Sequence, residues 1–147
     1  MTALADNRKA RFDYEILETF EAGLVLSGQE VKSAKGGHLN LRGSYVTLHN
    51  NEAYLINAHI SAYPFAGELP GYDPTRSRKL LLRQRELKYL IGKTQEKGLT
   101  IVPTKVYTKN RLIKLEFALA RGRKQYDKRE AIKKRDVQRE LRRTATN

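Results

Sequence analysis

The chain has 147 residues, no cysteine, and 29 Lys and Arg against 16 Asp and Glu, which is a formal net charge of +13. Its size and its 39% hydrophobic content predict one modest domain rather than two, and the lack of cysteine excludes disulfides and thiolate metal sites. The longest apolar runs are far below the ~20 residues that span a bilayer, and no apolar leader follows Met1, so we expect a cytoplasmic protein.

The first elements expected along the chain are two short strands and a helix. Residues 14–20 and 24–26 are β-type runs, and Gly23 can supply the positive φ of a turn or bulge between them. Residues 27–35 begin with the Ser and Glu of a capping box, in which two side chains satisfy reciprocal backbone donors. We therefore expect a short helix there, ended by the glycines that follow.

The middle of the chain is predicted to form a hairpin and a long loop. The β-rich runs 44–48 and 53–60 flank Asn50 and Asn51, residues that tolerate the left-handed backbone region of a tight turn. Residues 63–74 contain three of the four prolines, so this segment is expected to be a loop.

A second helix and the last strands are expected before residue 120. Residues 84–97 have apolar side chains at helical spacing, and Gly98 is a typical C-cap. Strands are expected at 99–102, 105–108 and 111–119, the last two joined through Lys109 and Asn110. The predicted fold is mainly β: a closed antiparallel barrel of oligonucleotide-binding (OB) type with two or so flanking helices, because closure protects the edges of short strands.

The sequence contains no pattern typical of a catalytic or metal site. His38, His49 and His59 are not at metal-ligand spacing, and no glycine-rich phosphate loop is present. Glu18 and Glu21 are the only carboxylates considered as a catalytic pair, but nothing in the sequence places them across a cleft. We expect neither an enzyme nor a bound cofactor.

Exposed cations and aromatic rings are instead suited to RNA, which proteins bind by pairing phosphates and stacking bases. Arg76, Arg78 and Lys79 begin a basic cluster that continues to Arg85, and Lys114 lies among the cations of the last hairpin. The candidate stacking rings are Tyr45, Tyr54, Tyr63, Tyr72 and Tyr107. At least three of these five are expected to be buried or half-buried.

The end of the chain differs from the rest in charge. Residues 121–147 hold eleven Lys and Arg against four Asp and Glu, whereas residues 1–120 hold eighteen against twelve. Apolar residues in the last segment are too few to offset the entropy of ordering it alone. We therefore predict a folded RNA-binding body at 1–120 and a basic C-terminal tail at 121–147 that is disordered when free and can become helical.

Five sequence blocks, in order, resemble those of the small protein B family, the bacterial SsrA-binding proteins (SmpB). The blocks are NRKARFDY at 7–14, EAGLVL at 21–26, GQEVKS at 28–33, DPTRSRKLLL at 73–82 and GRKQYDKR at 122–129. The resemblance covers nearly the whole chain, and five ordered blocks are far more specific than one.

The resemblance implies an OB-type barrel that binds the tRNA-like domain of transfer-messenger RNA (tmRNA, SsrA RNA). The family acts in trans-translation, in which alanyl-tmRNA enters a stalled 70S ribosome with elongation factor Tu and GTP and supplies a degradation tag. The implied role of the protein is to deliver the RNA and to replace the missing codon–anticodon pair, with no chemistry of its own. A monomer without membrane contact is expected.

Individual positions match family residues. Glu21, Leu81 and Lys114 match residues implicated in holding the RNA, and each suits that role here: Lys114 can pair with phosphate, Glu21 can accept from base or sugar donors, and Leu81 can pack on a base. The resemblance assigns ribosome engagement to Gly122, Arg123, Lys124, Tyr126, Asp127, Lys128 and Arg129. Arg123 replaces a family lysine, and Tyr126 stands where some relatives have histidine.

Two other classes of function stay open at this point. A general RNA-binding OB protein, such as a translation or ribosome-associated factor, would share the charge and the strands without preferring tmRNA. An RNA-processing enzyme would need a metal or a carboxylate cluster. A membrane-surface role would suit the net charge, but the tail has almost no apolar face to insert into a bilayer.

Overall fold

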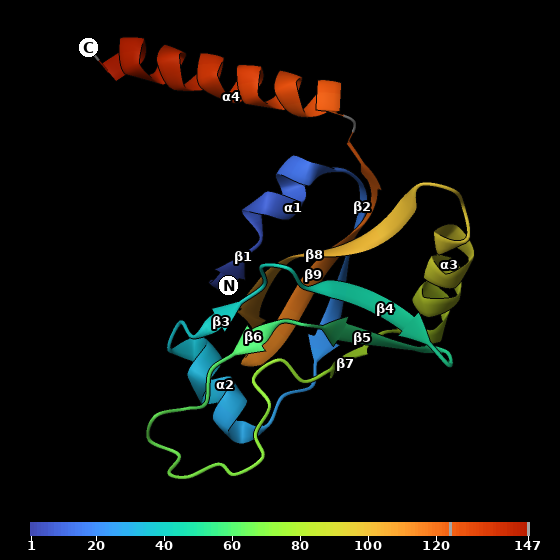
Figure 1. The fold of residues 1–147 in the computed structure, drawn as a ribbon, viewed down its shortest axis with the longest axis vertical. Coiled ribbons are helices and arrows are strands. Elements are labelled where there is room, and N and C mark those ends of the chain that lie inside the picture. The colour runs from blue at the N-terminus through green and yellow to red at the C-terminus, as the bar shows by residue number, and fades with distance from the viewer. Residues whose placement is uncertain (124, 147) are drawn as a thin grey trace.

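The computed structural model describes the backbone of residues 1–123 and 125–146, and the side chains at positions 1–123 and 132–142. The described helices are α1 (Arg8–Asp13), α2 (Gly28–Lys35), α3 (Gln84–Thr94) and α4 (Gln125–Thr146). The described strands are β1 (Thr2–Asp6), β2 (Tyr14–Leu24), β3 (Leu39–Asn40), β4 (Tyr45–His49), β5 (Glu52–Ile56), β6 (His59–Ile60), β7 (Arg78–Leu81), β8 (Leu99–Lys109) and β9 (Leu112–Gly122). Figure 1 shows their arrangement.

The strands form one large antiparallel sheet and one small pair. Seven strands lie in the order β1-β8-β9-β2-β7-β5-β4, and β3 pairs with β6 alone. Every strand pairing in the described chain is antiparallel. A mainly β antiparallel fold with a few helices is therefore confirmed.

The predicted closure of the barrel is wrong for the described strands. β1 and β4 are the two ends of the large sheet, and no strand ladder joins them. β1 pairs with residues 105–108 of β8, which leaves the first half of β8 without a strand partner on that edge. The first half of β8 faces the start of β4 across a cavity of about 400 Å³, lined by Tyr45 and by residues 100–102 among others. The sheet therefore curls around its core without closing by hydrogen bonds.

Strand β2 is continuous through the position where a turn was predicted. Glu21, Ala22 and Gly23 pair in register with β9, and Gly23 also pairs with Leu81 of β7. Gly23 is not among the glycines with positive φ. The prediction of two runs separated at Gly23 was wrong, because a central strand with a partner on each side keeps its extended backbone even at a glycine.

Strand β8 is also continuous, although two strands were predicted around Pro103. The ladder with β9 shifts register between Pro103 and Lys105, so the proline sits at a bulge, as expected for a residue without an N–H. Asn7, which caps α1, uses the carbonyls left at this bulge. Its side chain donates to Pro103 O at 2.9 Å and its backbone N–H donates to Thr104 O at 2.7 Å.

The two hairpin turns are formed by residues with positive φ. Asn50 and Asn51 connect β4 to β5 with φ of 49° and 58°, which confirms the predicted hairpin. The turn between β8 and β9 is at Asn110 and Arg111, one residue later than predicted, with φ of 51° and 65°. Helix α3 ends at Thr94, three residues before its predicted end.

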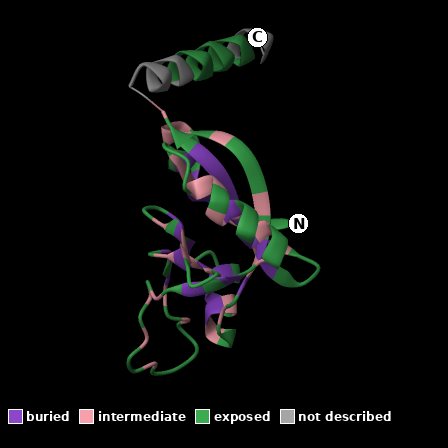
Figure 2. Ribbon diagram, turned by 90° about the vertical axis from the view of Figure 1, so that its right-hand side faces the viewer, coloured by how far each residue is buried: buried purple, intermediate pink, exposed green. Residues whose placement is uncertain are grey.

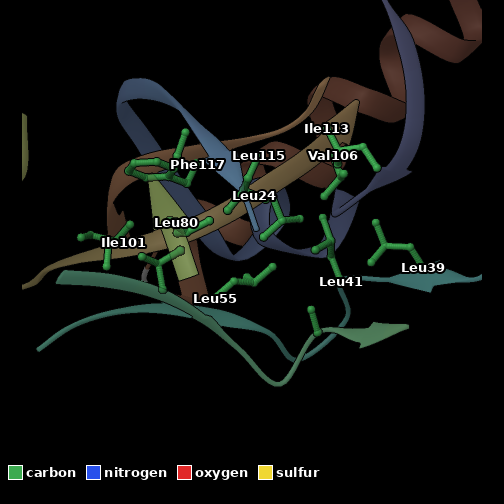
Figure 3. Close-up of a cluster of buried hydrophobic side chains, with 14 of the residues drawn as sticks. Leu24, Leu39, Leu41, Leu55, Leu80, Ile101, Val106, Ile113, Leu115 and Phe117 are labelled. Carbon is green, nitrogen blue, oxygen red and sulfur yellow. The ribbon is translucent and has the colours of Figure 1, made fainter. Parts of the chain in front are cut away.

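The core lies on the inner face of the curled sheet. Figure 3 shows its side chains, which converge from the strands that curl around the core. They include Leu24, Leu55, Leu80, Leu115 and Phe117. Leu87 and Leu90 of α3 complete it from one end. The buried residues in Figure 2 follow the strands, while the loops and the outer faces of the helices are exposed.

A buried ion pair joins α2 to the start of β7. The side chains of Glu30 and Arg78 are 0% exposed, and Arg78 Nε and Nη2 donate to Glu30 Oε2 at 2.9 and 2.7 Å. Arg78 Nη1 donates to Ala58 O at 2.6 Å, and Arg76 Nε donates to the same Glu30 oxygen at 3.1 Å. Glu30 also closes the predicted capping box with Ser27, which is confirmed. One carboxylate therefore holds a helix, a strand end and the loop that precedes it.

Helix α4 projects from the end of β9 and lies beside α1 (Figure 1). Its described side chains, at 132–142, are exposed. β9 continues to Gly122, so the sheet runs slightly beyond the predicted boundary at residue 120. The disorder of the tail in free solution stays a prediction, motivated by the sparse apolar residues of this segment.

Replacing Glu30 with Gln should destabilise the fold by about 3–5 kcal/mol, because it leaves two guanidinium groups without their charge partner while keeping the capping hydrogen bond. Burial raises the pKa of Glu30, but hydrogen bonds from Arg76, the Ser27 backbone and Arg78 outweigh burial and hold it at about 2. Because the folded pKa is depressed, this stabilisation is present above pH 4.5 and is lost as pH falls toward 2.

Urea unfolding between pH 2 and 7 measures both effects. The wild type should lose stability steeply below pH 4.5, and the Glu30→Gln variant should show a flatter profile. Glu96→Gln is the matched control, since the exposed Lys93–Glu96 pair should contribute less than ~1 kcal/mol. A Glu30→Gln variant as stable as this control would contradict the role of the buried pair.

Candidate nucleic-acid interface

A row of paired residues crosses four strands on the exposed face of the sheet. Tyr107 of β8 pairs with Lys114 of β9, Lys114 pairs with Gly23 of β2, and Gly23 pairs with Leu81 of β7. Partners in antiparallel strands point to the same face of a sheet. The register therefore brings a lysine and an exposed leucine to either side of a residue without a side chain.

Gly23 forms the floor of a polar groove between Lys114 and Leu81. The groove has a volume of about 460 Å³, and Glu21, Arg83, Arg85 and Glu86 complete its lining. Leu81 is 57% exposed beside it. A Cβ added at Gly23 would lie 3.4 Å from Leu81 Cβ, so the missing side chain accounts for the hollow. A glycine inside a strand often marks a place where a ligand approaches the backbone.

Glu21 is held in a fixed position at one side of this groove. The Tyr107 hydroxyl donates to Glu21 Oε2, and Lys109 Nζ lies 3.4 Å from both carboxylate oxygens. The hydrogen bond from Tyr107 lowers the pKa of Glu21 most, and Lys109 and Lys114 lower it further against a rise from burial. Glu21 is therefore charged at neutral pH, with lone pairs left to accept from another donor.

Tyr107 serves as a donor throughout the physiological pH range. Only 6% of the residue is exposed, and Tyr107 is not among the residues that line the groove. Burial and the neighbouring Glu21 raise the pKa of the hydroxyl, so it keeps its proton. Tyr107 thus positions the carboxylate without presenting a face for stacking.

The cations of the groove have charge available for a ligand. Lys114, Arg83 and Arg85 make no salt bridge with an acid in the part of the chain that the structure describes. Glu116, which pairs across the ladder with Glu21, is instead bound by Lys105 at 3.8 Å and by the Thr104 hydroxyl at 2.6 Å. The arrangement can bind phosphates on its cations and a base or ribose donor on Glu21.

The basic cluster predicted from Arg76 to Arg85 is divided by the structure, which places Arg83 and Arg85 in the groove lining. Lys79 is exposed on β7 and pairs with Glu52 at 3.3 Å, two residues from Leu81 on the same face. Arg78 is fully buried and Arg76 is half-buried, and both bind Glu30. The structure therefore separates Arg76 and Arg78 from Glu21, Leu81 and Lys114, and gives Arg78 a role inside the fold.

The predicted tail residues lie at the other end of β9. Gly122 pairs with Tyr14 at the end of the ladder, and the Arg123 N–H donates to Asp13 O at 2.9 Å. Lys124 lies outside the described residues. The remaining predicted tail residues are Tyr126, Asp127, Lys128 and Arg129; their backbone belongs to α4, and their side chains are not among those described.

The five candidate tyrosines are mostly covered, as expected. Tyr107 is buried, Tyr54, Tyr63 and Tyr72 are half-buried, and Tyr45 is exposed. Tyr54 and Tyr72 use their hydroxyls inside the protein: Tyr54 donates to Glu52, and Tyr72 donates to Ile60 O at 2.8 Å.

The described residues contain no group of three or more His, Asp or Glu side chains arranged to hold a metal ion. None of their helices is both long enough and apolar enough to cross a membrane.

The importance of Gly23 and Tyr107 was missed from sequence. Gly23 was assigned to a turn because glycine is a common turn residue, although β-type residues continue on both sides of it. Tyr107 was considered only as a stacking ring. A strand glycine two residues after a predicted site residue was the available signal for the groove floor. The hydrogen bond from Tyr107 of β8 to Glu21 of β2 reaches across β9, so it depends on a strand register that only the structure supplies.

A small, strongly basic β protein with a cation-lined groove on its sheet has the features of a nucleic-acid-binding protein. The SmpB protein family model matches residues 4–147, so the chain belongs to the SmpB protein family.

Individual relatives agree with this assignment. The SsrA-binding protein of Persephonella marina is 55% identical over 94% of this chain and 90% of its own length. That of Ligilactobacillus salivarius is 52% identical over 99% and 93%. A solved chain reported under the words "tmRNA-SmpB: a journey to the center of the bacterial ribosome" is 46% identical, with a TM-score of 0.67 over 86% of this chain and 92% of that one.

Replacing Tyr107 with Phe should raise the pKa of Glu21 toward its ordinary value, because the substitution removes the hydrogen bond that lowers it most. An NMR titration of the Glu21 carboxyl carbon measures the shift. Tyr54→Phe is the control, since its hydroxyl bonds Glu52 and should change the pKa of Glu52 alone. An unchanged Glu21 pKa in the Tyr107→Phe variant would show that Tyr107 does not hold this carboxylate.

Proposed function

We propose that the protein binds the tRNA-like domain of tmRNA through the groove formed by Glu21, Gly23, Leu81 and Lys114, and delivers this RNA to stalled ribosomes in trans-translation. The observation that carries the proposal is the strand register, which assembles in one groove the three body residues that match RNA-holding positions of the family. Membership of the family over residues 4–147 supports the same function.

Each side chain of the groove has a distinct part in this proposal. Lys114, Arg83 and Arg85 pair with backbone phosphates, which supplies affinity and salt dependence but little selectivity. Leu81 packs on an unstacked base above the floor at Gly23. Glu21 repels phosphate and accepts from base or ribose donors, so it favours one orientation of the RNA over others. Lys79 extends the cationic face along β7.

We propose that the tail binds the ribosome, whereas the body binds tmRNA. Residues 121–147 hold an excess of seven positive charges, and α4 is 22 residues or ~33 Å long, a basic rod suited to an rRNA-lined channel. In the proposal, Gly122, Arg123 and Lys124 form the junction, and Tyr126, Asp127, Lys128 and Arg129 engage the vacant message channel. Tyr126 can stack on an rRNA base without needing an imidazole.

The remaining parts of the proposal follow from the family. One copy of the protein binds one tmRNA in the cytoplasm, and elongation factor Tu with GTP joins the complex through the alanyl end of the RNA. No catalytic step is assigned to the protein itself. Its contribution is recognition of the RNA by the body and of the empty channel by the tail.

A competition binding assay with labelled tmRNA tests the groove. At physiological salt, tmRNA should outcompete equal masses of tRNA and rRNA fragments by orders of magnitude. Gly23→Ala should weaken tmRNA binding roughly 5-fold to 100-fold, because a methyl group fills the floor and overpacking costs about 1–3 kcal/mol. The same substitution should leave the fold as stable or more stable, since 3.4 Å is an ordinary contact with Leu81.

The matched control for this assay is Gly92→Ala on α3, where an added Cβ meets nothing within 4 Å. It should bind tmRNA as the wild type does. Equal competition by all RNAs with a steep salt slope would instead identify a general RNA-binding protein. A Gly23→Ala variant with wild-type affinity would remove the groove from the interface.

Truncation after Arg121 tests the division of labour between body and tail. The truncated chain should keep its preference for tmRNA but fail to support tagging on ribosomes stalled at the end of a message. A full-length variant with Lys128→Ala and Arg129→Ala should bind tmRNA normally and tag poorly. Tagging by the truncated chain at the wild-type level would refute the assignment of the tail to the ribosome.

A further inference from the structure

The segment between β6 and β7, residues 61–77, is the longest stretch of the described chain without helix or strand. In Figures 1 and 2 it lies at the end of the molecule opposite α4, and its backbone reaches well beyond α2. Its residues do not line the groove at Gly23. The loop is therefore a separate part of the surface, outside the function proposed for the groove.

The two ends of this loop are held by hydrogen bonds to the body. The Tyr72 hydroxyl donates to Ile60 O at 2.8 Å, and the Ile60 N–H donates to Pro74 O at 3.0 Å. On the other side, the buried Ser33 hydroxyl donates to Ser61 O at 2.6 Å. The buried Glu30–Arg78 pair lies directly beneath, because Arg78 also donates to Pro74 O at 2.9 Å. These contacts fix the base of the loop.

The tip of the loop is a tight turn that presents an aromatic ring. The Ala66 N–H donates to Tyr63 O at 3.1 Å, which places Pro64 and Phe65 at the two corners of the turn. Proline is favoured at the first corner because its φ is already set. The Tyr63 N–H donates to Gln29 Oε1 of α2 at 2.9 Å, so the start of the turn is anchored to a helix.

Phe65 is the most exposed aromatic residue in the part of the chain that the structure describes, at 85%. The rings of Tyr63 and Phe65 meet edge to face, with centroids 5.6 Å apart and planes inclined at 68°. Lys32 Nζ of α2 lies 5.8 Å from the Tyr63 ring centroid. A phenylalanine is thus presented to solvent on a braced turn, beside a second ring and an ammonium group.

We propose that Phe65 stacks on an unpaired base of RNA. A stable protein interface buries about 800 Å² on each partner, and the neighbours of Phe65 in the turn, which are Pro64, Ala66 and Gly67, add little apolar area. A single stacked base, in contrast, covers only about the area of one aromatic ring. Aromatic rings between cations are the usual platform on which proteins stack unpaired bases. Lys32 and the net charge of +13 complement the phosphates that flank such a base.

The chain contains no tryptophan, so Phe65→Trp introduces a single fluorescent reporter at the tip of the turn. Stacking on a base should quench the indole emission when the full-length variant is saturated with RNA. Titration with tmRNA alone and with 70S ribosomes decides whether the base belongs to tmRNA or to rRNA. His49→Trp, at the exposed end of β4, is the control and should keep its emission.

Affinity provides the second readout. Phe65→Ala should weaken binding to the RNA that quenches the reporter by about 5-fold to 100-fold, and Phe65→Tyr should restore it. The inference is overturned if neither RNA quenches the indole at Phe65, or if Phe65→Ala binds as tightly as His49→Ala does. A wild-type chain without preference for tmRNA would contradict the function proposed for the groove, but the indole response would still decide this inference.

Discussion

The ion pair between Glu30 and Arg78 is the interaction on which the functional surfaces depend. Both groups are removed from water, which is unfavourable unless the geometry and the additional hydrogen bonds are good, and here Arg76 and the Ala58 carbonyl supply them. The pair connects α2 to the first residue of β7. Because β7 alternates, burying Arg78 places Leu81 on the exposed face of the sheet, and the same pair supports the loop that carries Phe65.

The groove itself follows from strand register. Lys114 and Leu81 lie on either side of one position of β2, and a side chain at that position would fill the space between them. Gly23 occupies it and leaves the groove open. Around this floor the charges are unequal: several cations are available to phosphates, whereas Glu21 is bound by Tyr107 and Lys109 and remains an acceptor. Phosphate pairing gives affinity, and a fixed acceptor among cations gives selectivity.

Local signals were sufficient for the elements that local chemistry controls. The capping box at Ser27, the turn at Asn50 and the loop rich in proline are all present, because each depends on residues close in sequence. Predictions failed where distant partners decide. Gly23 is extended because β9 and β7 pair with it, and β8 continues past Pro103 because a bulge absorbs the proline. The barrel stays open because β4 and the first half of β8 face each other across a cavity instead of pairing. Within the basic cluster, the sequence predicts that Arg78 binds RNA, since its actual partner, Glu30, is 48 positions away.

In the function proposed above, the protein meets tmRNA at the groove on the outer face of β9, β2 and β7. Mapping backbone amide shifts of the isotope-labelled full-length chain, as the tRNA-like domain of tmRNA is added, tests this most directly. If tmRNA binds in this groove, the largest changes in the body fall at residues 21–24, 80–85 and 113–115. Changes concentrated instead on the hairpin of β4 and β5, with these three segments unaffected, would contradict it.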